Sequence, residues 1–125
     1  MKNKLSKQVV KKWLDNYGKA WKTGNLKLLE SLFSRDALYH ETPFQKPLRG
    51  IKEIKGYWRA ENEVWTGVKF RAKKFWISGD VFFAEWDCEL KRVSTKTKVR
   101  MAGVFVCETD KNMVKNLREF WHITY

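Results

Sequence analysis

The stretch of sequence that decides the fold is DALYHETPFQKPLRGIKEIKGYW, residues 36–58. Residues 37–41 predict a short strand, and Pro43 and Pro47 then enforce an extended loop. Proline has this effect because it fixes its own φ and keeps the preceding residue out of the helical region. A glycine after the loop opens a helix that carries an aromatic pair, so the stretch predicts a strand, an open loop and a helix.

Apolar periodicity predicts three helices around this stretch. The first covers about residues 6–23, and Gly24 ends it, while Asn25 can cap the second. The third follows the loop and is closed by Gly67. The apolar positions of the three helices are Val10, Trp13, Leu14, Tyr17 and Trp21; Leu26, Leu29, Leu32 and Phe33; and Ile51, Ile54, Trp58 and Trp65.

The rest of the chain predicts four long strands rich in aromatic and β-branched residues. They are Val68–Ser78, Val81–Val93, Thr97–Glu108 and Met113–Thr124, with turns at Gly79-Asp80, Thr95-Lys96 and Asp110-Lys111-Asn112. Strands of this length should bend at bulges. Helices followed by a meander predict an α+β fold. We expect residues 1–125 to form a single cone-like domain, with three N-terminal helices packed on a strongly curved antiparallel sheet that encloses a pocket.

Length and composition suit one such domain. The chain has 125 residues, 43% of them hydrophobic, with seven Trp and eight Phe, so a sizeable core can form. It has no run of about 18 apolar residues, and we expect no membrane partner. Its start, MKNKLSKQVVKKW, lacks the apolar stretch of a signal peptide, so we expect a cytoplasmic protein.

The formal net charge of +12 raises the question of an anionic partner. Of the 26 basic residues 19 are Lys, scattered along the whole chain. Lysine is a solvated point charge, whereas bidentate recognition of phosphate favours arginine. We therefore interpret the charge as a solvated surface and expect no nucleic-acid partner. RNA binding would show itself by a steeply salt-dependent affinity.

The cysteines and histidines predict neither a disulfide nor a metal site. Cys88 and Cys107 lack metal-ligand spacing, and a turn at Thr95-Lys96 would place Cys88 opposite Gly103, so two reduced core thiols are expected. The chain has only two His and no His/carboxylate spacing. It also lacks the glycine-rich motifs of nucleotide sites, so we expect no cofactor.

Glu119 is the clearest candidate for chemistry. It shares one face of the last predicted strand with Leu117, Trp121 and Ile123, and a carboxylate among these must be paired, hydrogen-bonded or raised in pKa. It could form a structural ion pair with Arg100 on a neighbouring strand. It could also be an acid, base or ligand anchor in the pocket.

Three segments occur in an order that resembles the SnoaL-like, nuclear-transport-factor-2-like superfamily: DALYHETPF, the helix from PLRG to YW, and the closing LREFWH. The resemblance covers about residues 9–122. It implies a cone-shaped fold around a ligand pocket, and homodimers that pair through the outer face of the sheet. The superfamily mixes cyclases, isomerases, epoxide hydrolases and non-catalytic binding domains, so the resemblance indicates a fold and leaves the reaction open.

Ketosteroid isomerases belong to this superfamily, and the resemblance extends to their catalytic positions. Tyr17, eight residues before Asn25, matches their oxyanion-hole tyrosine. Glu41 falls on the position of their general base, although the following proline is displaced by one residue. Their second oxyanion donor, a protonated Asp, falls on Gly103. Half of the oxyanion hole is therefore missing, and we expect a different proton transfer, if any, from Tyr17 and Glu41.

Two hypotheses follow for the function. In the first, the pocket binds a small, mostly apolar molecule and catalyses proton transfer, cyclisation or isomerisation. Its catalytic residues would be Tyr17, Glu41 and Glu119, and its ligand-binding residues Trp21, Trp58, Trp86, Arg100, Leu117 and Trp121. In the second, the chain is a non-catalytic binding or interaction module whose aromatic residues fill the pocket. A cavity of about 300 Å³ or more would favour a ligand site.

Overall fold

Helix α1 (Lys7–Thr23) begins and ends at the residues that the sequence indicates. The Ser6 side chain accepts a hydrogen bond from the Val9 amide, and Gly24 closes the helix with a φ of 69°. Only glycine adopts such a left-handed conformation without strain. Asn25 then caps the next turn by accepting from the Lys27 amide. These features belong to a computed structural model that describes residues 5–124.

The second predicted helix is shorter than expected. It consists of a 3₁₀ turn, η1 (Leu26–Leu28), and one turn of α-helix, α2 (Leu29–Leu32). Phe33, expected on this helix, instead opens strand β1 (Phe33–His40), where its ring packs edge-on against Trp13. Leu29 and Leu32 are buried, as the helical spacing predicts for this turn. After this turn the backbone becomes extended because of packing with residues distant in sequence.

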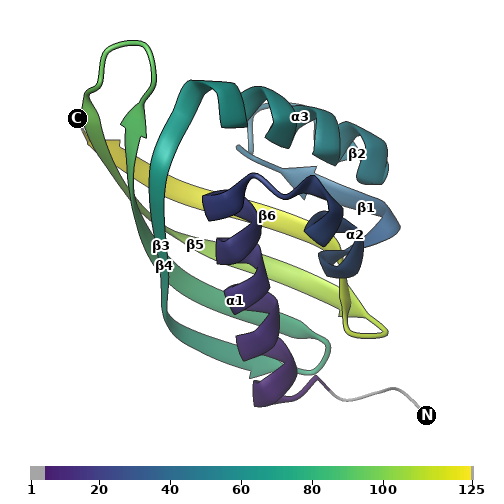
Figure 1. Cartoon of the computed structure of the whole chain (residues 1–125). Coiled ribbons are helices and arrows are strands. Elements are labelled where there is room, and N and C mark those ends of the chain that lie inside the picture. Colours follow the sequence, from purple (N-terminus) through teal and green to yellow (C-terminus); the bar gives the residue numbers. More distant parts are fainter. Residues whose placement is uncertain (1–4, 125) are drawn as a thin grey trace.

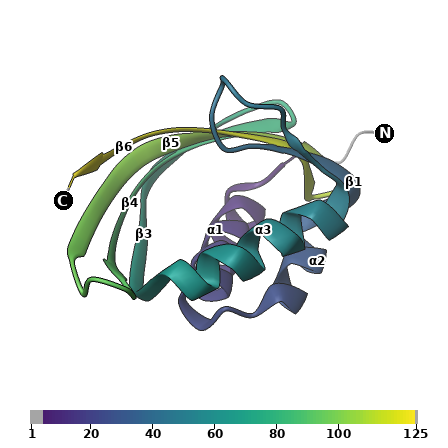
Figure 2. The same cartoon turned by 90° about the horizontal axis from the view of Figure 1, so that it is seen from above.

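Helix α3 (Gly50–Val64) also ends earlier than predicted, because Trp65 begins strand β3 (Trp65–Ser78). Gly67, expected to close the helix, has a φ of 62° and lies where the register between β3 and β4 shifts. A second shift follows between Ala72 and Lys74. Such bulges bend a strand, and Figure 2 shows the sheet arching over α1 and α3. The expected bending of the long strands is confirmed.

Six strands form one sheet in the order β2-β1-β6-β5-β4-β3. Strands β3, β4 (Val81–Arg92), β5 (Lys98–Asp110) and β6 (Met113–Thr124) form the predicted antiparallel meander. The prediction of a wholly antiparallel sheet was wrong, because β1 pairs with β6 in parallel. The meander separates these two strands in sequence, so no hairpin sets their relative direction. The short β2 (Leu48–Arg49), which the sequence did not reveal, extends the edge beside β1.

The helices cover the concave side of the sheet, and the core lies between them (Figure 1). Along β4, alternate residues Phe82, Ala84, Trp86, Cys88 and Leu90 are buried against the helices, as the alternation predicts. Both cysteines are buried and free, but Cys88 lies opposite Met101 and not Gly103. The expected pairing was two residues out of register. The turn was predicted at Thr95-Lys96, whereas the last residues that pair between β4 and β5 are Lys91 and Lys98, which places the turn one residue earlier. No described helix is long and apolar enough to cross a membrane.

Candidate functional site

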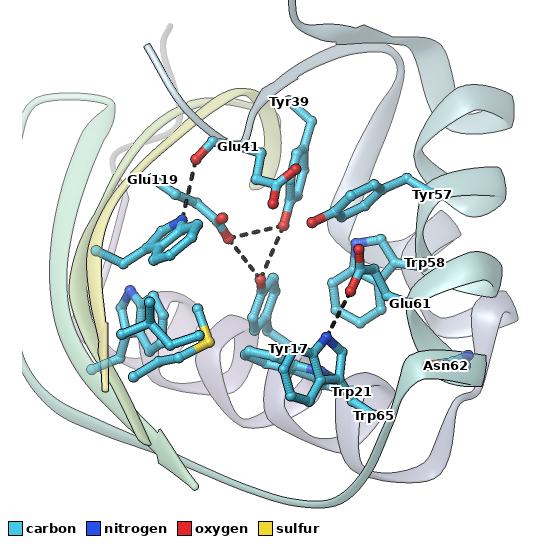
Figure 3. Close-up of a pocket in the computed structure, with 14 residues that line it drawn as sticks. Tyr17, Trp21, Tyr39, Glu41, Tyr57, Trp58, Glu61, Asn62, Trp65 and Glu119 are labelled. Atoms are coloured by element: carbon cyan, nitrogen blue, oxygen red, sulfur yellow. Dashed lines mark hydrogen bonds between the residues drawn. The ribbon is translucent and has the colours of Figure 1, made fainter. Parts of the chain in front are cut away.

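A cavity of about 180 Å³ opens between the inner face of the sheet and helices α1 and α3 (Figure 3). Its lining combines many aromatic rings with three glutamates, Glu41, Glu61 and Glu119. Among the residues that the structure describes, no Lys, Arg or His lines it. The cavity is therefore acidic inside a chain whose net charge is +12.

Three side chains from three elements meet at the inner end of the cavity. The Tyr39 hydroxyl on β1 donates to Glu119 Oε1 at 2.9 Å, and the Tyr17 hydroxyl on α1 donates to the same oxygen at 3.2 Å. The two hydroxyl oxygens lie 3.3 Å apart (Figure 3). We call Tyr17, Tyr39 and Glu119 the Tyr–Tyr–Glu cluster.

The second oxygen of Glu119 faces open space. Among the described residues, the enclosed side-chain atoms without a partner are the indole nitrogens of Trp58 and Trp86 and the amide oxygen of Asn116. Glu119 Oε2 is not among these enclosed atoms, so it is accessible from the cavity. The residue lines the cavity although it is only 8% exposed. This oxygen is thus free to meet a ligand.

Burial is the main reason why the pKa of Glu119 is raised to about 8. The hydrogen bonds from Tyr39 and Tyr17 favour the ionised form and oppose this shift, whereas the charges of Glu41 and Glu61 reinforce it. Burial also raises the pKa of each tyrosine well above its ordinary value, and the nearby Glu119 charge adds to the effect. The tyrosines therefore remain protonated donors while Glu119 titrates close to neutral pH.

The other two glutamates lie toward α3. Glu61 Oε2 accepts a hydrogen bond from the Trp65 indole at 2.8 Å, and burial raises its pKa. The Glu41 backbone carbonyl accepts from the Trp121 indole at 3.2 Å, which fixes the chain where β1 ends. Its carboxylate lies beside Tyr57 (Figure 3), whose pKa is raised by burial and by the charges of Glu61 and Glu41.

The structure brings most of the sequence-predicted site residues together. Those that line the cavity are Tyr17, Glu41, Glu119, Trp21, Trp58, Trp86 and Trp121. Leu117 does not, because it is fully buried in the core. The placement of Arg100 was wrong. It is exposed on the outer face of β5, opposite Glu89 and Thr124, because strand alternation turns Val99 and Met101 inward. The ion pair with Glu119 is therefore excluded.

Several lining residues were missed by sequence reasoning: Tyr39, Tyr57, Glu61, Asn62, Trp65, Met101 and Ile123. Two had a readable signal. Tyr39 lies two residues before Glu41, and side chains with this spacing share a face of an extended strand. Glu61 lies three residues after Trp58, and residues with this spacing are neighbours on a helix. His40 and His122 do not line the cavity, and His122 is exposed on the outer face of β6.

The cavity falls short of about 300 Å³, the volume set above as favouring a ligand site, and lies below the range of about 300–1,000 Å³ that is usual for drug-sized ligands. Its volume of about 180 Å³ is close to that of an engineered cavity of about 150 Å³ that binds benzene. The aromatic side chains thus occupy much of the cone without closing it. A ligand of modest size fits the remaining space, and a steroid does not.

Comparison with known families identifies the chain. Residues 10–116 match the model of the SnoaL-like domain. The chain therefore belongs to the SnoaL-like family, as the resemblance in its sequence indicated. A search of curated proteins found no match.

Solved structures share the fold at low sequence identity. A candidate isomerase from Bacillus subtilis has a TM-score of 0.81 and 20% identity, covering 92% of this chain and 87% of that one. A protein of ketosteroid-isomerase-like fold from Catenulispora acidiphila, in complex with trimethylamine, has a TM-score of 0.78 and 17% identity, covering 93% and 86%. An epoxide hydrolase of the LEH-like kind from M. tuberculosis has a TM-score of 0.76 and 13% identity, covering 92% and 84%. At these identities the likeness shows the fold alone.

Proposed function

We propose that the cavity binds a small organic molecule with a largely apolar body, and that Glu119 exchanges a proton with it. The observation that carries this proposal is the Glu119 carboxyl itself. One oxygen is held by two tyrosine hydroxyls, and the other faces the cavity. A group with a pKa of about 8 can accept or release a proton at neutral pH.

The tyrosines act on this proton transfer through Glu119. Each has one hydroxyl proton, and both donate it to Oε1, so the cluster stabilises the ionised carboxylate. Glu119 is thereby held in one orientation with Oε2 toward the ligand. We assign Tyr17 the role of a positioning residue and not of an oxyanion donor, because it donates its proton to Glu119. Glu41 lines the same cavity and is a second candidate base.

Steroid isomerisation is not the proposed reaction. Gly103 supplies no side-chain donor, and a cavity of about 180 Å³ is too small for a steroid. Loss of one oxyanion donor lowers the rate by about 10²–10³ in a well-studied protease. We expect no turnover of a β,γ-unsaturated ketosteroid, and robust turnover would show that the cavity is misassigned.

The solved structures that share this fold include an epoxide hydrolase and a candidate isomerase, and the proposal of a proton transfer agrees with this variety of activities. The trimethylamine complex shows that this kind of fold can hold a molecule of only a few atoms. A non-catalytic binding module remains the second candidate, because the many rings around the cavity reduce its volume.

Hydrogen–deuterium exchange on a small ketone tests the proposal. Cyclohexanone in D₂O loses its α-protons to a general base, and ¹H NMR follows the loss. We expect wild type to accelerate this exchange and Glu119→Gln, which keeps the shape of the side chain, to abolish the acceleration. Ketone binding is measured on both proteins by tryptophan fluorescence. Ketone binding without accelerated exchange by wild type would leave the non-catalytic module as the function, and equal acceleration by both proteins would assign the base to Glu41.

We also propose that the protein is a homodimer that pairs through the outer face of the sheet. Phe120, Trp76 and Val104 are 48%, 54% and 36% exposed there. Phe83 and Val106 lie between them on neighbouring strands. A contiguous apolar patch of this kind commonly marks an interaction surface.

A further inference from the structure

We infer that the ligand of the cavity is a small organic cation, an amine or quaternary ammonium ion whose alkyl groups contact the aromatic walls. This inference rests on the proposed function and names its ligand class.

The charge of the lining has one sign. Glu41, Glu61 and Glu119 all line the cavity, and within residues 5–124 no basic side chain does. Buried charges without partners are costly, and the raised pKa values of Glu61 and Glu119 record that cost. A cation in the cavity would supply the missing partner. An anion would add to the repulsion.

One cation, Arg92, contacts a wall of the cavity from outside the lining. The Arg92 guanidinium lies over the Trp65 ring, 4.6 Å from its centroid, and its charge lowers the pKa of Glu61 against the larger effect of burial. Arg92 therefore compensates one of the three glutamates in part. Trp65 also shows that an aromatic wall of this site already carries a cation on one face.

The walls suit an alkylated cation better than a metal ion. Eight of the lining residues are Trp or Tyr, and cations bind over such rings within about 6 Å of the centroid. Within the described part of the chain, no group of three His, Cys, Asp or Glu side chains is placed to hold a metal. The carboxylates are thus too far apart to chelate a metal ion. Their spacing suits a larger, softer cation that lies between them.

Glu119 Oε2 provides the independent sign of a ligand. It belongs to a residue that is more than nine-tenths buried, it has no hydrogen-bond partner among residues 5–124, and it borders the cavity. A cation beside it would favour the ionised carboxylate. Binding below about pH 8 would then release a proton. The titratable groups that face Glu119 are Tyr17 from α1, Tyr39 and Glu41 from β1 and its end, Tyr57 and Glu61 from α3, and Cys107 from β5.

A charged probe and its neutral isostere test the inference. Choline and 3,3-dimethylbutan-1-ol have the same shape and differ in charge, and isothermal titration calorimetry measures both. We expect choline to bind at least about tenfold more tightly, the equivalent of about 1.4 kcal/mol. Its affinity should rise between about pH 6 and about pH 8 with proton release, while that of the alcohol stays constant.

Two variants on α3 locate the effect. Glu61→Gln removes one charge and keeps an oxygen that can accept from the Trp65 indole, so choline affinity should fall severalfold and alcohol affinity should not. Glu63→Gln, on the exposed side of the same helix, should change neither. Equal binding of the two probes would overturn the cation inference and leave the proposed function standing. If neither probe binds at millimolar concentration, the inference fails as well, and the ketone exchange decides the proposed function separately.

Discussion

Glu119 is a buried acid whose native environment holds its proton to unusually high pH. The pKa is raised to about 8 in the folded chain, whereas a glutamate in an unfolded chain has a pKa of about 4.3. Strand alternation in the sequence places this residue inside, since Leu117 and Trp121 flank it on the same face. Its partners could not be predicted, because Tyr17 and Tyr39 come from distant segments and alternation along one strand carries no information about them.

The first prediction concerns stability and pH. Between about pH 4.3 and about pH 8 the folded chain binds a proton that the unfolded chain has lost, so stability falls as pH rises through this window and levels off above it. The slope from this one group is at most about 1.4 kcal/mol per pH unit. Glu119→Gln should remove that contribution and be neutral or stabilising at pH 8. Urea unfolding of both proteins across this range measures it, and identical slopes would contradict it.

A second prediction concerns the donors. Tyr39→Phe removes the 2.9 Å hydrogen bond that favours the ionised carboxylate, so the pKa of Glu119 should rise further. A hydrogen bond to a charged group is worth about 1.5–3 kcal/mol, which corresponds to a shift of about one to two units. Tyr57→Phe is the control, because Tyr57 makes no hydrogen bond to Glu119 in the structure. Carboxyl ¹³C NMR follows both variants, and equal titration curves would argue against the cluster.

At the scale of elements, the strands of the meander could be predicted to within three residues at either end, whereas only the second half of β1, and none of β2, was predicted. Met113–Thr124 is β6 as predicted, because the tight turn at Lys111 and Asn112, both with positive φ, and a clean alternation fix it. Phe33 looked helical because the apolar spacing continues through it. Its place in β1 depends on Trp13 and Tyr39, which are remote in sequence.

The close approach of β5 and β6 gives a prediction at this scale. A Cβ at Gly103 would stand 2.4 Å from the Phe120 carbonyl oxygen and 2.8 Å from the Trp121 Cβ. Gly103→Ala should therefore destabilise the fold by about 1–3 kcal/mol, as overpacking does. Ala102→Ser, on the exposed side of the same strand, should have little effect. Thermal melts compare the two, and a stable Gly103→Ala protein would mean that the strands can separate locally.

At the scale of the whole molecule, the sequence predicted a sheet wrapped around a pocket and part of the lining, but not the acidic character of the lining as a whole. Trp21, Trp58 and Trp86 could be assigned because each lies on an apolar face of its own element. The acidity of the site arises only when the ends of β1 and α3 meet, which brings Glu41 and Glu61 to the same cavity. Arg100 was misplaced, although the alternation along β5, which turns Val99 and Met101 inward, places it on the outer face.

The predicted dimer is tested at this scale. Light scattering at tens of micromolar should give twice the chain mass of 15.0 kDa. Phe120→Lys places a charge in the outer apolar patch and should shift the protein to monomer. Phe44→Lys changes a residue that is 95% exposed but lies in the loop after β1, and it should leave the mass unchanged. A wild-type monomer would refute pairing through this face.

The proposed acid–base role depends most on the protonation state of the Glu119 carboxyl group, and the titration of this group is the most direct test. Protein labelled with ¹³C at the glutamate carboxyl is titrated by NMR, and Glu119→Gln assigns the signal. We predict a midpoint of about 8 for Glu119. A midpoint near the ordinary value of about 4.3 would mean that Glu119 is solvated or paired, and it would contradict its role as the acid–base group of the cavity.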